Sequence, residues 1–201
     1  MSTSSCNYQV TQSMRIVSGS LKGRIIQAPE GKQTRPTTDR VRESVFNVLA
    51  HNPDIPDIEG VRVIDLFAGS GALGFEALSR GASFCLFVEV AAGARGIIRR
   101  NIEAFQLFGN TRIHRRSATD LGPKPNGVGE PFNLVFLDPP YGEGLVVPAL
   151  RQLVLGNWIV PGTLAVIETP EEEEPEAENW VCLETRDYGE TKVSFLVYKP
   201  D

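Results

Sequence analysis

Four consecutive residues near the middle of the chain could together hold and methylate a base amine. Asp138-Pro139-Pro140-Tyr141 directly follows an apolar segment at 132–137. The two prolines stiffen the turn and offer no amide donors, so the Asp138 carboxylate and the Pro139 carbonyl can both face one small region. Two acceptors that bind the hydrogens of an exocyclic base amine free its conjugated lone pair and stabilise the positive charge that develops on nitrogen. Since the ring of Tyr141 can stack on a base for about 1–3 kcal/mol, this motif predicts the catalytic site: Asp138, Pro139, Pro140 and Tyr141.

A glycine-rich turn earlier in the chain could bind the methyl donor. Asp65 precedes the pattern Gly69-x-Gly71-x-x-Gly74, and Glu89 ends the next strand-like segment. Glycines let the backbone approach a nucleotide-like ligand, and a carboxylate at the second strand end can accept both ribose hydroxyls. Asp65 would repel a pyrophosphate but attract the cationic amino group of a methionine moiety; its alternative role is to cap the following helix. The pattern predicts S-adenosylmethionine as the cofactor, bound by Asp65, Gly69, Gly71 and Glu89.

The elements that must position these residues follow from the hydrophobic pattern. Alternating strands and helices predict a mostly parallel sheet covered on both faces, with the ligand at the carboxyl ends of its strands. Expected strands are 61–67, 83–88, 111–114, 132–137 and 163–168, with an antiparallel pair at 181–185 and 193–198. Expected helices are 39–51, 72–80, 94–108 and 145–155. Short strands at 15–17 and 24–26 would form a hairpin around Ser18-Gly19-Ser20. We therefore expect one domain over 14–201, whose residues 14–38 are a hairpin and loop extension, after a disordered tail at 1–13.

Charge is unevenly distributed, although the net charge is −5. Basic residues gather between residues 14 and 42 and again between 95 and 116, whereas acidic residues gather between 168 and 190. Such a basic half is compatible with a phosphate-binding face. No apolar run approaches the roughly 20 residues of a membrane span, and the polar start lacks a signal-peptide pattern. We expect a cytoplasmic monomer. We expect no metal site, because the cysteines and histidines are too scattered along the chain to form one.

Several segments resemble the RsmD family of bacterial 16S rRNA guanine-N2 methyltransferases, in order and from Met14 onward. The most specific is the stretch at 35–43, and the others lie at 14–19, 65–74, 76–81 and 138–141. The resemblance implies a Rossmann-like S-adenosylmethionine-dependent methyltransferase sheet with a small N-terminal β-hairpin extension. It implies a flipped or unpaired guanine as the acceptor, in 16S rRNA of the 30S subunit or its assembly intermediates. At the cofactor it adds Phe67, and Ser117 where the family often has Asn or Asp. At the RNA it implies Arg15, Arg24, Arg35, Pro36, Thr37 and Arg42.

Three alternatives remain at this stage. A DNA adenine-N6 or cytosine-N4 methyltransferase would use the same motif, but such enzymes usually carry a recognition domain for which 201 residues leave no room. A nicotinamide-dependent oxidoreductase fits the glycine pattern but has no use for Asp138 to Tyr141. An inactive RNA-binding assembly factor would not need the intact Asp138 and Glu89.

Overall fold

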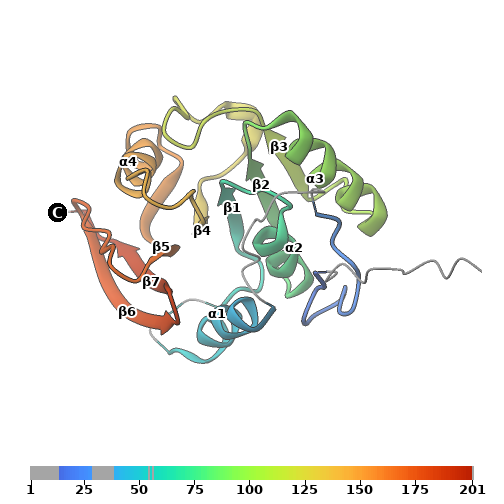
Figure 1. Ribbon diagram of the computed structural model, residues 1–201. Helices are drawn as coiled ribbons and strands as arrows, with labels where there is room; N and C mark the ends of the chain where they lie inside the picture. Colours follow the sequence, from blue (N-terminus) through green and yellow to red (C-terminus); the bar gives the residue numbers. More distant parts are fainter. Residues whose placement is uncertain (1–13, 29–38, 54, 56, 201) are drawn as a thin grey trace, which may run out of the picture.

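The sheet has seven strands in the order β3-β2-β1-β4-β5-β7-β6, of which the first five are parallel (Figure 1). The computed structural model describes residues 14–28, 39–53, 55 and 57–200. The strands are β1 (Arg62–Leu66), β2 (Phe84–Val88), β3 (Thr111–His114), β4 (Phe132–Leu137), β5 (Ile159–Pro170), β6 (Trp180–Tyr188) and β7 (Thr191–Tyr198). The helices are α1 (Asp39–His51), α2 (Ala72–Ser79), α3 (Ala92–Phe105), α4 (Val146–Leu155) and the 3₁₀ turn η1 (Asn126–Val128).

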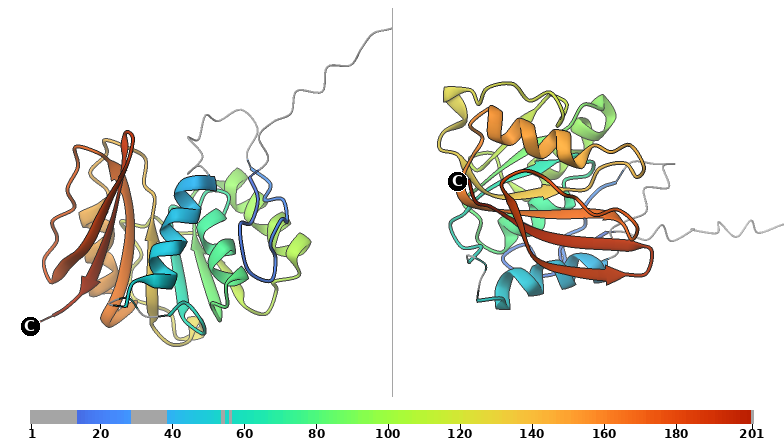
Figure 2. Two further views of the ribbon diagram at one scale, coloured as in Figure 1. Left: turned by 90° about the horizontal axis from the view of Figure 1, so that it is seen from below. Right: turned by 90° about the vertical axis from the view of Figure 1, so that its left-hand side faces the viewer.

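The parallel strands are apolar on both sides because helices cover both faces of the sheet. On one face, α1, α2, α3 and the segment 14–28 bury Val45, Phe75 and Ile98 against β-strand residues. On the other face, α4 and the connection 115–131 bury Leu150 and Leu121. The two further views show this sandwich, with α4 on one side of the sheet and α1 on the other (Figure 2). None of the helices in the described part of the chain is long and apolar enough to cross a bilayer.

The N-terminal segment 14–28 packs beside α2 and α3 rather than forming a regular hairpin (Figure 1). Its two arms pair antiparallel at one bridge, Arg15 with Ile25. Ile16 and Ile26, both almost fully buried, anchor the arms in the core. The two expected strands are thus reduced to a single bridge with three backbone hydrogen bonds between the arms, and the connection at 17–21 is bound to α2 instead.

The predicted elements after residue 38 are confirmed, with shifted ends. The clearest differences are β5, β6 and β7, which run longer than the apolar runs that indicated them because β5 and β6 pair with β7 beyond those runs. The helix α3 begins at Ala92 and ends at Phe105, before the expected end at 108, and Gln106 after it adopts a left-handed conformation. The expected tail at 1–13 lies outside the described residues.

Candidate active site

The predicted site residues meet at the carboxyl edge of three neighbouring strands. Leu66 pairs with Val88 of β2 and with Leu137 of β4. Glu89 and Asp138 are the next residues of their strands, so they lie level at the edge. Two strand spacings, about 10 Å, separate β2 from β4. The edge can therefore accommodate a donor at Glu89 and an acceptor base at Asp138 with β1 and its glycine turn between them.

Asp65 lies inside the protein, below the glycine turn. It is 2% exposed, and its Oδ2 accepts a hydrogen bond of 3.1 Å from the backbone N–H of Gly74. Burial raises the pKa of this carboxyl to about 7, the Gly74 bond opposes that shift, and the Glu89 charge adds to it. Gly74 lies in the first turn of α2, whose backbone donors have no partner within the helix. The structure thus places Asp65 where it caps α2 and braces the turn.

The backbone of the turn after β1 packs closely on the core. Gly71 has a φ of 82°, and a Cβ there would stand 2.6 Å from the ring of Phe75. Only glycine fits such a position without displacing the core. Phe67, at the start of the turn, also has a positive φ of 60° and packs against the core. A bulky residue held there indicates that the turn is strongly constrained.

Glu89 binds the turn from the neighbouring strand. Its Oε2 accepts from the N–H of Gly69 at 2.9 Å, and its Oε1 accepts from the N–H of Ala91 at 2.7 Å. The side chain is partly exposed. A partly exposed carboxylate, oriented by two backbone donors, suits the recognition of a diol.

Ser117 lies on the next connection, after β3. Its Oγ accepts from the N–H of Thr119 at 3.2 Å and lies 2.8 Å from the Thr119 hydroxyl. An isolated bridge between Ser117 and Asp120 closes this tight turn. The Ser117 hydroxyl therefore makes its hydrogen bonds within residues 117–120, and these bonds stabilise the turn.

The motif after β4 has its two ends held differently. Pro139 is buried and Pro140 exposed, while Asp138 and Tyr141 are partly exposed. The Tyr141 hydroxyl lies 3.2 Å from Oε1 of Glu168 and 3.1 Å from the hydroxyl of Thr191. Burial is the main cause that raises the pKa of Tyr141, and the charges of Glu168 and Asp138 add to it. The phenol therefore stays protonated and can donate. Glu168 and Thr191 were not expected from the sequence, since they belong to β5 and β7 and form no motif with Tyr141.

A family model described as Conserved hypothetical protein 95 matches residues 14–197. The chain belongs to this family, the RsmD family.

Individual members of known function or structure are similar to this chain over most of its length. Ribosomal RNA small subunit methyltransferase D of Haemophilus influenzae is 34% identical, over 92% of this chain and 93% of that protein. The protein of that name from Escherichia coli is 35% identical, over 81% of this chain and 78% of its own length. The solved structure of yhhF from Escherichia coli has a TM-score of 0.78 and 29% identity, and the match covers 94% of this chain and 99% of that chain. The fold is the Rossmann-like fold of S-adenosylmethionine-dependent methyltransferases.

Arg42, expected at the RNA from the RsmD resemblance, is instead part of a buried charge cluster. Its side chain is 0% exposed, its Nε lies 3.7 Å from Oε2 of Glu76, and it donates to the carbonyl of Arg15. Oε2 and Oε1 of Glu76 also accept from the N–H groups of Val17 and Ser18, at 2.7 and 3.0 Å. The prediction of RNA contact is therefore wrong for Arg42. This guanidinium helps to fasten the N-terminal segment to α2.

The remaining expected RNA contacts divide into two groups. Arg15 and Arg24 are exposed on the N-terminal segment. Arg24 donates to the carbonyl of Ala104, and its guanidinium lies 5.4 Å from the Phe105 ring centre, so α3 holds part of this side chain. Arg35, Pro36 and Thr37 lie outside the described residues.

The N-terminal segment is connected to the glycine turn through Asn101 of α3, a residue that the sequence did not single out. This fully buried side chain donates to the carbonyls of Gln27 and Ser70, at 3.1 and 3.2 Å, and accepts from the N–H of Gln27 at 2.9 Å. A polar residue on the otherwise apolar side of α3 was the available signal. Asn101 links the exposed basic segment to the glycine turn.

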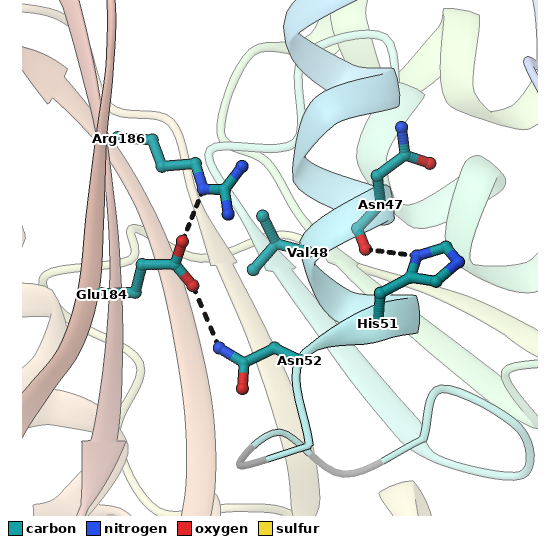
Figure 3. Close-up of a pocket in the computed structure, with 6 residues that line it drawn as sticks. All are labelled: Asn47, Val48, His51, Asn52, Glu184 and Arg186. Carbon is teal, nitrogen blue, oxygen red and sulfur yellow. Dashed lines mark hydrogen bonds and ion pairs between the residues drawn. The ribbon is translucent and has the colours of Figure 1, made fainter.

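A groove of about 380 Å³ lies elsewhere, between α1 and β6 (Figure 3). Its lining residues are Asn47, Val48, His51, Asn52, Glu184 and Arg186. The carboxylate of Glu184 binds Arg186 at 2.5 Å and Asn52 at 3.0 Å, so these polar groups of the groove are bonded to one another. Since α1 runs antiparallel to β6, with Ser44 at Tyr188 and Asn52 at Glu184, the groove extends away from the edge that carries Asp138. It is therefore separate from the candidate active site.

Proposed function

We propose that this protein transfers a methyl group from S-adenosylmethionine to the exocyclic N2 amine of a guanine in 16S rRNA. The observation that carries this proposal is the position of Asp138-Pro139-Pro140-Tyr141, level with Glu89 at one edge of a methyltransferase sheet. The enzyme would be a cytoplasmic monomer that acts on the 30S subunit or its assembly intermediates. Two relatives carry the name ribosomal RNA small subunit methyltransferase D, which supports RNA of this subunit as the substrate.

The residues at the edge fit the proposed cofactor. Glu89 would accept the ribose hydroxyls, and its partly exposed carboxylate is already oriented by Gly69 and Ala91. Gly69 and Gly71 would let the turn approach the ligand, with Phe67 at its start and Ser117 beside the adenine. Asp65, buried beneath the turn, would act on a cationic amino group through its field and through the turn that it braces.

The motif after β4 would bind and activate the guanine amine. S-adenosylmethionine supplies a methyl group activated as a sulfonium, which leaves as a neutral thioether. The amine nitrogen forms the new bond to the methyl carbon while the bond between that carbon and sulfur breaks. Asp138 and the Pro139 carbonyl would hold the two amine hydrogens and stabilise the charge that develops on nitrogen. The amine then loses one proton, which the Asp138 carboxylate can accept and pass to water.

The N-terminal segment would contribute to RNA binding. Exposed Arg15 and Arg24 belong to the segment that Asn101 connects to the glycine turn, and Arg24 itself contacts the last turn of α3. Guanidinium groups suit phosphate contacts, which position a nucleic acid without reading its sequence. Arg35, Pro36 and Thr37, which continue the same segment, are proposed to extend this surface.

The proposal is tested by radiolabelled methyl transfer to 30S particles from cells that lack this activity, with nuclease mapping of the labelled base. We expect label in one guanine of 16S rRNA, as N2-methylguanine. Asp138→Ala should lose transfer by about 10²–10³-fold and retain the affinity for S-adenosylmethionine. Glu130→Ala, which removes an exposed carboxyl at the opposite end of β4 from the motif, is the matched control and should keep full activity.

Other labelled products would contradict specific parts of the proposal. Label in DNA adenine or cytosine, with none in 30S particles, would replace the RNA substrate by DNA. Full activity of Asp138→Ala would remove the catalytic role of the motif.

A further inference from the structure

We propose that Glu168 and Thr191 position the ring of Tyr141 for the acceptor base through a chain of hydroxyl hydrogen bonds. This inference rests on the proposed function, because it concerns how Tyr141 stacks on a base. It adds two residues from β5 and β7 to a site whose other members lie at or after the ends of β1, β2, β3 and β4.

The proton arrangement of this chain follows from donor counting. Tyr141 has one hydroxyl proton, and Oε1 of Glu168, at 3.2 Å, can only accept when the carboxyl is ionised. The proton of Tyr141 therefore points to Glu168. The contact of 3.1 Å between Tyr141 and Thr191 then requires the Thr191 hydroxyl to donate. The chain thus runs from Thr191 through Tyr141 to the charged end at Glu168.

Both anchors stand at the catalytic edge on the same face of the sheet. Leu137 pairs with Ile167, so Asp138 and Glu168 are the next residues of adjacent strands. Across the following strand, Glu168 pairs with Val193 and Pro170 pairs with Thr191. Side chains alternate along a strand, so Glu168, Val193 and Thr191 share one face, and buried Val193 identifies it as the face covered by α1.

Tyr141 needs such anchoring because its own backbone lies outside any helix or strand. Residues 138–145 connect β4 to α4, and Gly142 and Gly144 both have positive φ angles of 75° and 61°. A connection of this kind restricts the tyrosine ring less than a strand would. The Tyr141 hydroxyl is bonded to residues of β5 and β7, so the ring is held at its hydroxyl end as well as at its backbone. This restraint lowers the entropy that the ring loses when a base stacks on it.

The test is a double-mutant cycle on methyl transfer to 30S particles, with Thr191→Val, Tyr141→Phe and the pair combined. Val is close to Thr in size but lacks the hydroxyl, and Phe retains the stacking ring. Each single change should lower the single-turnover rate by about 3- to 10-fold. The KM for particles should change by less than about 2-fold because phosphate contacts set most of that affinity. The combined variant should be no slower than Tyr141→Phe alone, since both changes break one chain.

Three further variants distinguish positioning from a general structural effect. Thr191→Ser retains the hydroxyl and should restore at least half of the wild-type rate. Glu168→Gln still presents a carbonyl oxygen to Tyr141, so it should slow transfer less than Tyr141→Phe and add nothing to it. Tyr188→Phe removes the hydroxyl of the residue that pairs with Thr191 at the same turn, and it should leave the rate unchanged.

The outcomes separate this inference from the proposed function. A wild-type protein that fails to methylate 30S particles would remove the proposed function and the inference with it. An active wild type in which the losses of Thr191→Val and Tyr141→Phe multiply would overturn the inference alone. Failure of Thr191→Ser to recover the rate would do the same.

Discussion

Protonation of buried Asp65 should make the stability of the free protein depend on pH in a way that Asp65→Asn abolishes. Asn keeps a side-chain oxygen for the Gly74 N–H, which Asp65 now binds at 3.1 Å. It cannot ionise, however, so it removes the cost of a buried negative charge. The comparison therefore isolates the titration of this one carboxyl.

The sign follows from the pKa, which burial raises from its ordinary value of 3.8 to about 7. The folded protein retains this proton more tightly than the unfolded chain does. Protonation of Asp65 thus stabilises the fold fully below about pH 4, and that stabilisation is lost as the pH rises through 7. Between pH 5 and pH 8 the loss amounts to about 2–3 kcal/mol by linkage. The side chain is 2% exposed, so screening by solvent does not reduce this figure greatly.

Urea unfolding of both proteins at pH 5, 6, 7 and 8 measures the effect. The difference in free energy of unfolding, Asp65→Asn minus wild type, should rise by about 2–3 kcal/mol from pH 5 to pH 8. Titrating groups that do not interact with Asp65 contribute equally to both proteins and cancel. Saturating S-adenosylmethionine should flatten the wild-type curve, because a nearby cation favours the ionised carboxyl. Parallel pH curves for the two proteins would refute the reasoning, since Asp65 would then titrate alike in the folded and unfolded chains.

Three further predictions concern the cofactor site and the N-terminal segment. Glu89→Ala should weaken S-adenosylmethionine binding by about 10²-fold, from the loss of two hydrogen bonds to a charged acceptor; calorimetry measures it, and an unchanged dissociation constant would remove Glu89 from the site. Glu76→Gln removes a buried carboxylate charge that lies 3.7 Å from Nε of Arg42 and 2.8 Å from Nε of Arg80, so it should lower the free energy of unfolding by about 3–5 kcal/mol, measured by urea unfolding. Gly19→Ala should lower the melting temperature, because the new Cβ would stand 1.8 Å from the carbonyl oxygen of Ser79. Gly23→Ala has a similar φ and nothing within 4 Å, so it controls for backbone strain, and an equal loss in both would argue against the clash.

The local pattern of residues was enough to predict most of the fold and to propose the reacting groups. Strands and helices were recognisable because apolar periodicity reflects which face each element buries. The sites after β1, β2 and β4 were recognisable because glycine turns, strand-end carboxylates and the Asp138 motif are each local in the chain. The parallel pairing of β1 to β5 was predictable from the alternation of strand and helix, whereas the order of the strands was seen only in the structure.

Only the tertiary structure revealed which polar groups lie next to one another when they are distant in the chain. In the sequence, Arg42 is one more basic residue of a stretch expected to bind RNA. In the structure it is buried next to Glu76 and binds the N-terminal segment at Arg15. The sequence also gives no sign that Thr191 and Glu168 contact Tyr141, because these three residues come together only through the pairing of β5 with β7. The physical reason is that burial and hydrogen bonding depend on the packing of whole elements. A motif can name the chemistry of a side chain, but not the environment that sets its charge and orientation.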